Sequence, residues 1–368
     1  MIAIISRTTR LSCWQLLIVF ASISPFAWSQ AQAIGTEPDG TDSEQIVNGN
    51  FTEFSAGISA GAGLQRITTG PDGNLWFAES SGNRIGRITP AGVVTEFSEG
   101  ISAGAAPHGI TSGPDGNLWF TEETGNRIGR ITPSGVVTEF GVDTFNGAVI
   151  YGITAGPDGN LWFTELSANK VGRITPAGDI TEFSVGISAN AGPYEITAGP
   201  DGNLWFAENF AGGPQAGGIA RITPLGEVTE FTIGIGATSQ PRPWDITVGT
   251  DGNLWFPEAG IAQIGRITPT GTVTEFSDLI FGPGLSGIAA SSGGNIWFTE
   301  GSADQIGWIT PTGDVTEFHG ITVPVGFVGF ATPTYIANGP DGNIWFTEVE
   351  ANRIGRLNIR IFADGFGG

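Results

Sequence analysis

Apolar residues along this chain fall into short runs that return at a regular spacing. The run Asp-Gly-Asn-Leu-Trp-Phe stands at 72–77, 115–120, 158–163, 201–206 and 251–256, and close variants stand at 293–298 and 341–346. Seven Thr-Glu-Phe triplets keep the same period of about forty-three residues. No part of 51–358 has a sustained helical period, so the pattern predicts a repeat built from short strands.

Each repeat is predicted to contain four strands. In the second repeat these are 109–112, 117–122, 127–132 and 136–140. Gly-Pro-Asp-Gly joins the first two strands and Thr-Pro-Ser-Gly the last two, and both place Pro and Gly where a tight reversing turn needs them. Leu118-Trp119-Phe120 is apolar without alternation, which is typical of a strand that is buried on both faces.

The ends of the repeated region decide how the repeats are arranged. An orphan fourth strand, 51–54, precedes the first complete repeat, and the last repeat ends at 353–357 without a fourth strand. Pairing these segments would close a ring, whereas an open solenoid would need polar caps. We therefore predict an all-β fold, a seven-bladed β-propeller of four-stranded antiparallel blades, closed by strand 51–54 pairing with the last blade.

Such a ring has two different edges. The Pro-Asp-Gly turns lie on one, the turn edge, and they are short and uniform. The links between blades lie on the other, the mouth edge, and they vary in length, as at 209–218, 277–286 and 320–334. Variable loops on a rigid scaffold usually carry binding, so we expect any functional site at the mouth edge.

One position of each first strand is predicted to face the channel mouth, namely the residue two before the conserved Ile. Across the blades it is occupied by Gln65, His108, Tyr151, Tyr194, Trp244, Ser286 and Thr334. Three neighbouring aromatics, a histidine and polar residues could bind a ligand, or could simply plug the channel. The glutamates and arginines that recur in the blades are interpreted as structural pairs, but Glu123 occurs in the second blade alone.

The chain ends and the composition bear on location and partners. Residues 1–33 read as a secretory signal peptide, 34–50 as a linker, 51–358 as the propeller, and 359–368 as a tail without an assigned role. Removing the signal, which carries Arg7 and Arg10 and no acid, takes the net charge from −21 to −23. We expect a secreted or periplasmic monomer with no membrane span after cleavage, and such acidity argues against nucleic acid as a partner.

The repeated cassette resembles the streptogramin B (virginiamycin B) lyases. Gly-Pro-Asp-Gly-Asn-Leu-Trp-Phe-Thr-Glu, Asn-Arg-Ile-Gly-Arg-Ile-Thr-Pro and Val-Thr-Glu-Phe are similar to theirs across 51–358. The resemblance implies a seven-bladed propeller that opens a cyclic depsipeptide antibiotic, and so confers antibiotic resistance. The reaction is a carbon–oxygen elimination in which a histidine removes a proton and magnesium stabilises the enolate.

The resemblance also assigns roles to particular residues. In Ala106-Pro107-His108-Gly109-Ile110, His108 matches the catalytic base, and Glu123 matches one magnesium ligand. Ala106 stands where the family has a second metal carboxylate, and Gln65 stands where it has a substrate-binding histidine. Tyr151, Tyr194 and Trp244 remain the further candidates for binding the substrate.

Two functions stay open at this point. One is a secreted lyase that acts on a cyclic depsipeptide or related ester. The alternative is a non-catalytic ligand- or protein-binding propeller of the cell envelope, favoured by the losses at Ala106 and Gln65. A serine hydrolase has little support, because the chain contains only two histidines. A lactonase-like calcium site is also disfavoured, because turn chemistry explains the repeated Asp-Gly-Asn.

Overall fold

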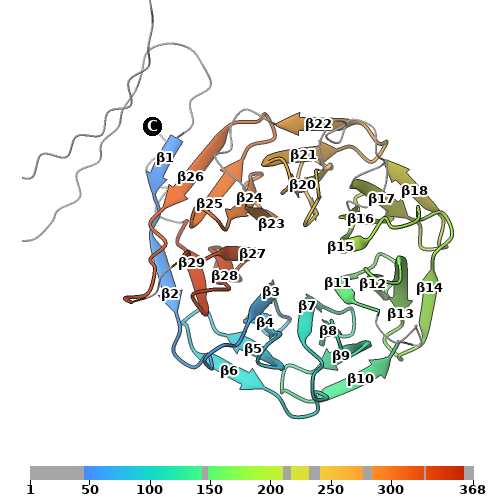
Figure 1. Cartoon of the computed structure of the whole chain (residues 1–368), viewed down its shortest axis with the longest axis horizontal. Coiled ribbons are helices and arrows are strands. Elements are labelled where there is room, and N and C mark those ends of the chain that lie inside the picture. The colour runs from blue at the N-terminus through green and yellow to red at the C-terminus, as the bar shows by residue number, and fades with distance from the viewer. Residues whose placement is uncertain are drawn as a thin grey trace, which may run out of the picture. The chain divides into compact units, whose positions relative to one another are not determined.

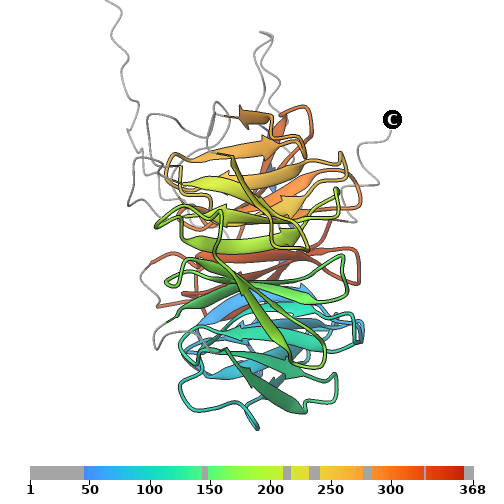
Figure 2. The ribbon, with the colours of Figure 1, turned by 90° about the vertical axis from the view of Figure 1, so that its right-hand side faces the viewer.

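A computed structural model of the chain describes residues 45–142, 148–209, 217–231, 241–276, 284–326 and 329–359. They form seven sheets arranged in a ring, with the first strand of each sheet innermost and the fourth outermost (Figure 1). Seen from the side, the strands run from one edge of the ring to the other (Figure 2). The described residues contain no helix. The predicted all-β seven-bladed propeller is confirmed.

The first four blades follow the chain in order. Blade 1 comprises β3 (Leu64–Thr69), β4 (Leu75–Glu79), β5 (Arg84–Ile88) and β6 (Val94–Phe97). Blade 2 comprises β7 (Pro107–Ser112), β8 (Leu118–Glu122), β9 (Arg127–Ile131) and β10 (Val137–Gly141). Blade 3 comprises β11 (Ile150–Ala155), β12 (Leu161–Glu165), β13 (Lys170–Ile174) and β14 (Ile180–Phe183). Blade 4 comprises β15 (Pro193–Ala198), β16 (Leu204–Glu208), β17 (Gly218–Ile222) and β18 (Val228–Phe231).

The last three blades include both ends of the described chain. Blade 5 comprises β19 (Thr247–Val248), β20 (Leu254–Glu258), β21 (Gln263–Ile267) and β22 (Val273–Phe276). Blade 6 comprises β23 (Leu285–Ala290), β24 (Ile296–Glu300), β25 (Gln305–Ile309), β26 (Val315–His319) and an added strand, β1 (Gln45–Asn48). Blade 7 comprises β27 (Pro333–Asn338), β28 (Ile344–Glu348), β29 (Arg353–Leu357) and β2 (Phe51–Phe54).

The ring closes as predicted. Strand β2 lies antiparallel to β29, with Phe51 opposite Leu357 and Phe54 opposite Ile354. One feature was not predicted, since β1 lies within the segment interpreted as a linker and pairs in parallel with β26. The start of the described chain therefore spans blades 6 and 7. The segment predicted to be a signal peptide, the rest of the predicted linker and nearly all of the tail lie outside the described residues.

The repeated aromatic residues account for the packing between blades. Trp76 is fully buried, clusters with Leu118 and Phe120 of the next blade, and lies 5.3 Å from the ring of Phe97 in its own blade. Its Nε1–H donates to Asp72 of the preceding turn at 3.0 Å. Phe77 covers Gly86 on the neighbouring strand so closely that a Cβ there would lie 2.2 Å from the ring. The cassette therefore specifies a rigid scaffold that packs blade against blade.

Candidate functional site

A bulge in six of the seven innermost strands, all except β19, determines which side chains reach the channel. In blade 2, Pro107 pairs with Glu122 and Ile110 pairs with Phe120, so two residues of β7 stand opposite the single residue Thr121 of β8. A bulge of this kind interrupts the alternation of sides along a strand. Side chains from both positions, two before and one before the conserved Ile, therefore meet inside the ring.

Four rings from blades 2 to 5 contact one another in a continuous series, here called the aromatic arc, and each neighbouring pair is tilted. The ring of His108 lies 3.7 Å from that of Tyr151, Tyr151 lies 4.1 Å from Tyr194, and Tyr194 lies 5.0 Å from Trp244. Tyr151 and Trp244 are partly exposed, whereas Tyr194 is buried. The structure thus brings together four of the residues that the sequence placed at the channel mouth.

The other predicted mouth residues are held by polar contacts. Gln65 donates from Nε2 to Ser80 Oγ at 3.1 Å. The Ser286 hydroxyl lies 2.9 Å from that of Thr299 and donates to the Thr334 carbonyl at 3.1 Å. Gln65 therefore contacts its own blade, while Ser286 and Thr334 join blade 6 to blade 7.

His108 is buried within the arc. It is 1% exposed, and its Nε2 lies 3.1 Å from the hydroxyl of Tyr335 in blade 7. Burial, together with the charge of Arg66, lowers the pKa of His108 to about 3, so the imidazole is neutral at physiological pH. Among the described residues, Nδ1 of His108 has no hydrogen-bond partner. A base with so low a pKa has little capacity to accept a proton.

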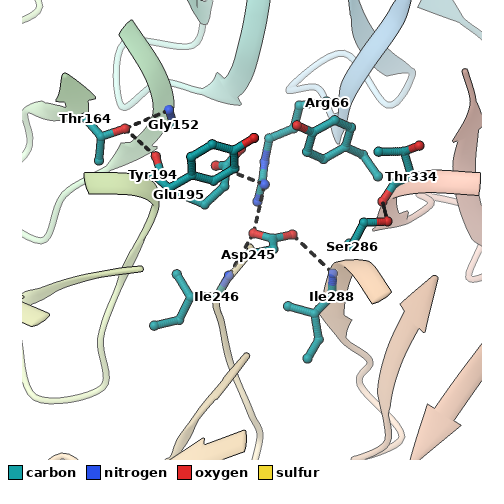
Figure 3. A network of polar contacts seen from close by, with 12 residues as sticks. Arg66, Gly152, Thr164, Tyr194, Glu195, Asp245, Ile246, Ser286, Ile288 and Thr334 are labelled. Atoms are coloured by element: carbon teal, nitrogen blue, oxygen red, sulfur yellow. Dashed lines mark hydrogen bonds and ion pairs between the residues drawn. The ribbon is translucent and has the colours of Figure 1, made fainter. Parts of the chain in front are cut away.

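Three ionisable residues, here called the channel cluster, each lie one position farther along the chain than the mouth residue of their blade. Arg66 Nη1 lies 2.9 Å from Asp245 Oδ1 and 3.1 Å from Glu195 Oε2. Both carboxylates are buried, while the Arg66 side chain is 21% exposed. Arg66 comes from blade 1 and its partners from blades 4 and 5, on the opposite side of the ring (Figure 3). This ion pairing therefore crosses the channel.

Hydrogen bonds and charge define the cluster further. Asp245 accepts from the backbone N–H of Ile246 at 2.8 Å and of Ile288 at 3.1 Å, so it also ties blade 5 to blade 6 (Figure 3). Burial raises the pKa of Glu195 to about 8; Arg66 opposes this rise and Asp245 adds to it. Burial also works against the charge of Arg66, but Asp245 and Glu195 outweigh it and raise the pKa of Arg66.

The channel cluster was not predicted, although the sequence contains a signal for it. The position directly before the conserved Ile is glycine in blades 2, 3 and 6 and is Arg66, Glu195, Asp245 and Tyr335 in the other four. The glycines make room: a Cβ at Gly152 would lie 2.8 Å from Glu195 Oε2 (Figure 3). The sequence analysis predicted one channel-facing position per strand, whereas the bulge brings the next residue to the channel as well.

Glu123 lies in the turn that follows β8, at the mouth edge. Its backbone N–H donates to the Ala106 carbonyl at 3.0 Å, and burial raises the pKa of its carboxyl group. Ala106 has a φ of 53°, in the left-handed region. The segment before His108 and the turn after β8 are therefore adjacent, as the resemblance requires.

Comparison with known proteins identifies the family. The model of the virginiamycin B lyase family matches residues 42–278 and 238–362. A streptogramin B lyase structure is 35% identical with a TM-score of 0.74, covering 84% of this chain and 98% of that one. The chain belongs to the virginiamycin B lyase family. No curated protein sequence matches it.

Two structures of virginiamycin B lyase from Staphylococcus aureus are similarly related. The selenomethionine-substituted protein is 36% identical with a TM-score of 0.72, covering 84% of this chain and 99% of that one. A catalytically inactive His-to-Ala variant with quinupristin is 36% identical with a TM-score of 0.73, with the same coverage. A hydrazine synthase from Kuenenia stuttgartiensis, at 14% identity, shares the fold alone.

The magnesium site implied for virginiamycin B lyases does not fit the residues of this chain. Magnesium requires oxygen ligands in near-octahedral geometry. Glu123 offers one carboxylate, Ala106 offers none, and the described residues contain no group of three or more acidic, histidine or cysteine side chains that could hold a metal ion. The family scaffold is thus retained here with a different set of groups at the mouth.

Proposed function

We propose that this protein is a non-catalytic binding propeller of the virginiamycin B lyase family. It holds a small-molecule or cyclic peptide ligand against the aromatic arc at the mouth of its channel. The aromatic arc itself is the observation that carries this proposal, because contiguous rings on a rigid scaffold, two of them partly exposed, form a preorganised apolar surface. The Arg66 side chain reaches across the channel one residue deeper, so the ligand enters from the mouth edge.

The state of His108 supports binding rather than elimination. General-base catalysis is most efficient when the pKa of the base lies near the working pH, and the pKa of His108 is lowered to about 3. Its Nε2 contacts Tyr335, and the ring is covered by Tyr151. The mouth also offers too few carboxylate ligands for magnesium, because Glu123 supplies one and Ala106 none.

Titration with quinupristin tests this proposal, followed by tryptophan fluorescence and by mass spectrometry of the ligand. We expect saturable binding without linearised product. Trp244→Ala and Tyr151→Ala should each weaken binding by about tenfold, as expected for central aromatic contacts. The matched control is Leu225→Ala, because Leu225 is 87% exposed on the turn edge. Affinity that is unchanged in both mouth variants would contradict the proposal.

The second candidate is the family's carbon–oxygen lyase activity, and the position of His108 favours it. His108 occupies the Pro-His-Gly-Ile segment that matches the family's base, beside the turn that carries Glu123. For this reaction the ligand would have to displace Tyr335 from His108 Nε2. Linearised quinupristin that forms with the parent chain and disappears with His108→Ala would establish this reading in place of the first.

We also propose that residues 1–33 are removed and that the mature monomer is secreted or periplasmic. The charged start, apolar stretch and small-residue cleavage site of this segment support the proposal. Fractionation of cells and the N-terminal sequence of the mature protein test it, and a mature chain that still begins at Met1 would contradict it.

A further inference from the structure

Two glutamates and an arginine recur together at the mouth edge of three blades. In blade 1, Glu79 ends the second strand, Glu96 lies in the fourth, and Arg84 begins the third strand between them. Arg84 Nε lies 3.0 Å from Glu79 Oε2 and 3.4 Å from Glu96 Oε2. Blades 2 and 7 repeat this bridge through Arg127 and Arg353. One cation therefore holds two carboxyl groups in each of these blades.

Blade 5 keeps both glutamates but has no arginine between them. Glu258 ends β20 opposite Gln263, which stands where blades 1, 2 and 7 have the arginine. Glu275 lies opposite Gly265, in the same register as its counterparts in blades 1 and 7. Because the register is the same, Glu258, Gln263 and Glu275 converge at one place on the mouth edge.

The oxygens at this place lack partners. Glu258 is 0% exposed, and within the part of the chain that the structure describes neither of its carboxyl oxygens has a hydrogen-bond partner. Oε1 of Gln263 is likewise buried without a partner. Burial and then Glu275 raise the pKa of Glu258 to about 8, whereas an arginine opposes this rise at Glu348. Arg242, on the preceding link, is exposed and does not lower the pKa of Glu258.

Buried polar atoms without partners are costly, so they indicate a group that the site receives. Two carboxylates and an amide carbonyl are oxygen ligands, the kind that hard divalent cations prefer. Calcium accepts a flexible set of such oxygens, whereas magnesium requires near-octahedral geometry. A divalent ion also balances both carboxylates, which a single arginine balances only in part. The set contains two acids and one amide, so it is distinct from the groups of three or more acidic, histidine or cysteine side chains that the described chain lacks.

We propose that blade 5 binds a calcium ion between Glu258, Gln263 and Glu275, at the place that an arginine occupies in blades 1, 2 and 7. Water completes the coordination of the ion. The ion is structural, because it holds the end of β20, where the Pro257 carbonyl accepts from the Trp244 N–H at 3.2 Å. The site is separate from the surface of the aromatic arc, so this inference does not rest on the proposed binding function.

Calcium titration of the EDTA-treated, dialysed chain tests the inference, by calorimetry and by thermal unfolding. We expect one calcium ion per chain, with a dissociation constant of about 10⁻⁴ to 10⁻³ M and magnesium at least about tenfold weaker. Calcium at about 10 mM should raise the thermal midpoint by about 2–5 °C. Glu258→Gln should weaken calcium binding at least about tenfold.

Gln263→Arg is the decisive variant, because it restores the cation of the other blades and keeps both carboxyl groups. It should raise the thermal midpoint without calcium and abolish the further rise with calcium. The matched control is Glu227→Gln, which removes one carboxylate from an exposed position on the turn edge and should bind calcium like the parent.

Four results would each overturn the inference. These are the absence of saturable calcium binding, binding that Gln263→Arg retains, a loss in Glu227→Gln equal to that in Glu258→Gln, and magnesium binding as tight as that of calcium. None of them bears on quinupristin binding at the aromatic arc, which is measured separately.

Discussion

Replacing Arg66 by methionine removes the one cation of the channel cluster and keeps the length of the side chain. The carboxyl groups of Glu195 and Asp245 then remain, and their side chains are 0% and 2% exposed. In the parent they lie 3.1 Å and 2.9 Å from Arg66 Nη1, respectively. Removing one partner of a buried ion pair costs far more than the pair contributes, because the remaining charge is left without compensation.

The magnitude follows from burial and from the number of partners. Breaking a fully buried pair destabilises a protein by about 3–5 kcal/mol. Arg66 is itself 21% exposed, so we expect the lower end, about 3 kcal/mol, for Arg66→Met. Lys170→Met is the matched control, because Lys170 and Glu182 form a pair at 2.7 Å in which both side chains are about one-quarter exposed. Its cost should stay below about 1 kcal/mol.

Urea unfolding, followed by tryptophan fluorescence, measures both variants. The loss in Arg66→Met should be smaller at pH 5 than at pH 8.5. Without Arg66 the folded-state pKa of Glu195 rises further above its ordinary value, so this group contributes stability at low pH that disappears as pH rises through the folded pKa. Adding Glu195→Gln and Asp245→Asn removes the unpaired charges and should restore more than half of the loss.

A loss of less than about 1 kcal/mol in Arg66→Met, with an unchanged denaturant slope, would refute this reasoning. So would a triple variant that is no more stable than Arg66→Met. Either result would mean that the cross-channel contacts contribute little to the closed ring.

Three further predictions concern pH, metal and ring closure. Burial raises the pKa of several glutamates at the mouth edge, to about 7 for Glu79 and to about 8 for Glu258 and Glu348. The free energy of unfolding, measured by urea titration, should therefore be highest near pH 5 and fall as pH rises through 7 to 8. Ala106→Glu supplies the second carboxylate that the sequence resemblance implies beside Glu123. Calorimetry should find at least about tenfold tighter magnesium binding than in the parent, and equal binding would remove Glu123 from a metal role. Phe54 of the closing strand stacks on Trp345 with their ring centroids 5.4 Å apart. Phe54→Ala should therefore lower the free energy of unfolding by about 2 kcal/mol. An unchanged urea midpoint would show that ring closure does not depend on this contact.

Much of this fold can be read from local, repeated signals. The strands, the tight turns and the closing strand 51–54 follow from residues that are close in sequence and recur in every blade. The Asp72–Trp76 contact, for example, spans four residues and returns in five other blades. Such contacts can be predicted from the repeated sequence, because equivalent residues pack in the same way in each blade.

The interior of the channel was decided only by the tertiary structure. Arg66 meets Asp245 across 179 residues of chain, and Tyr335 meets His108 across 227. The sequence by itself determined the blades, the turns, the closure and four rings of the arc. Ring curvature and the strand bulge determined which side chains cross the channel and how deeply His108 is buried, because both depend on how seven blades face one another rather than on any one of them.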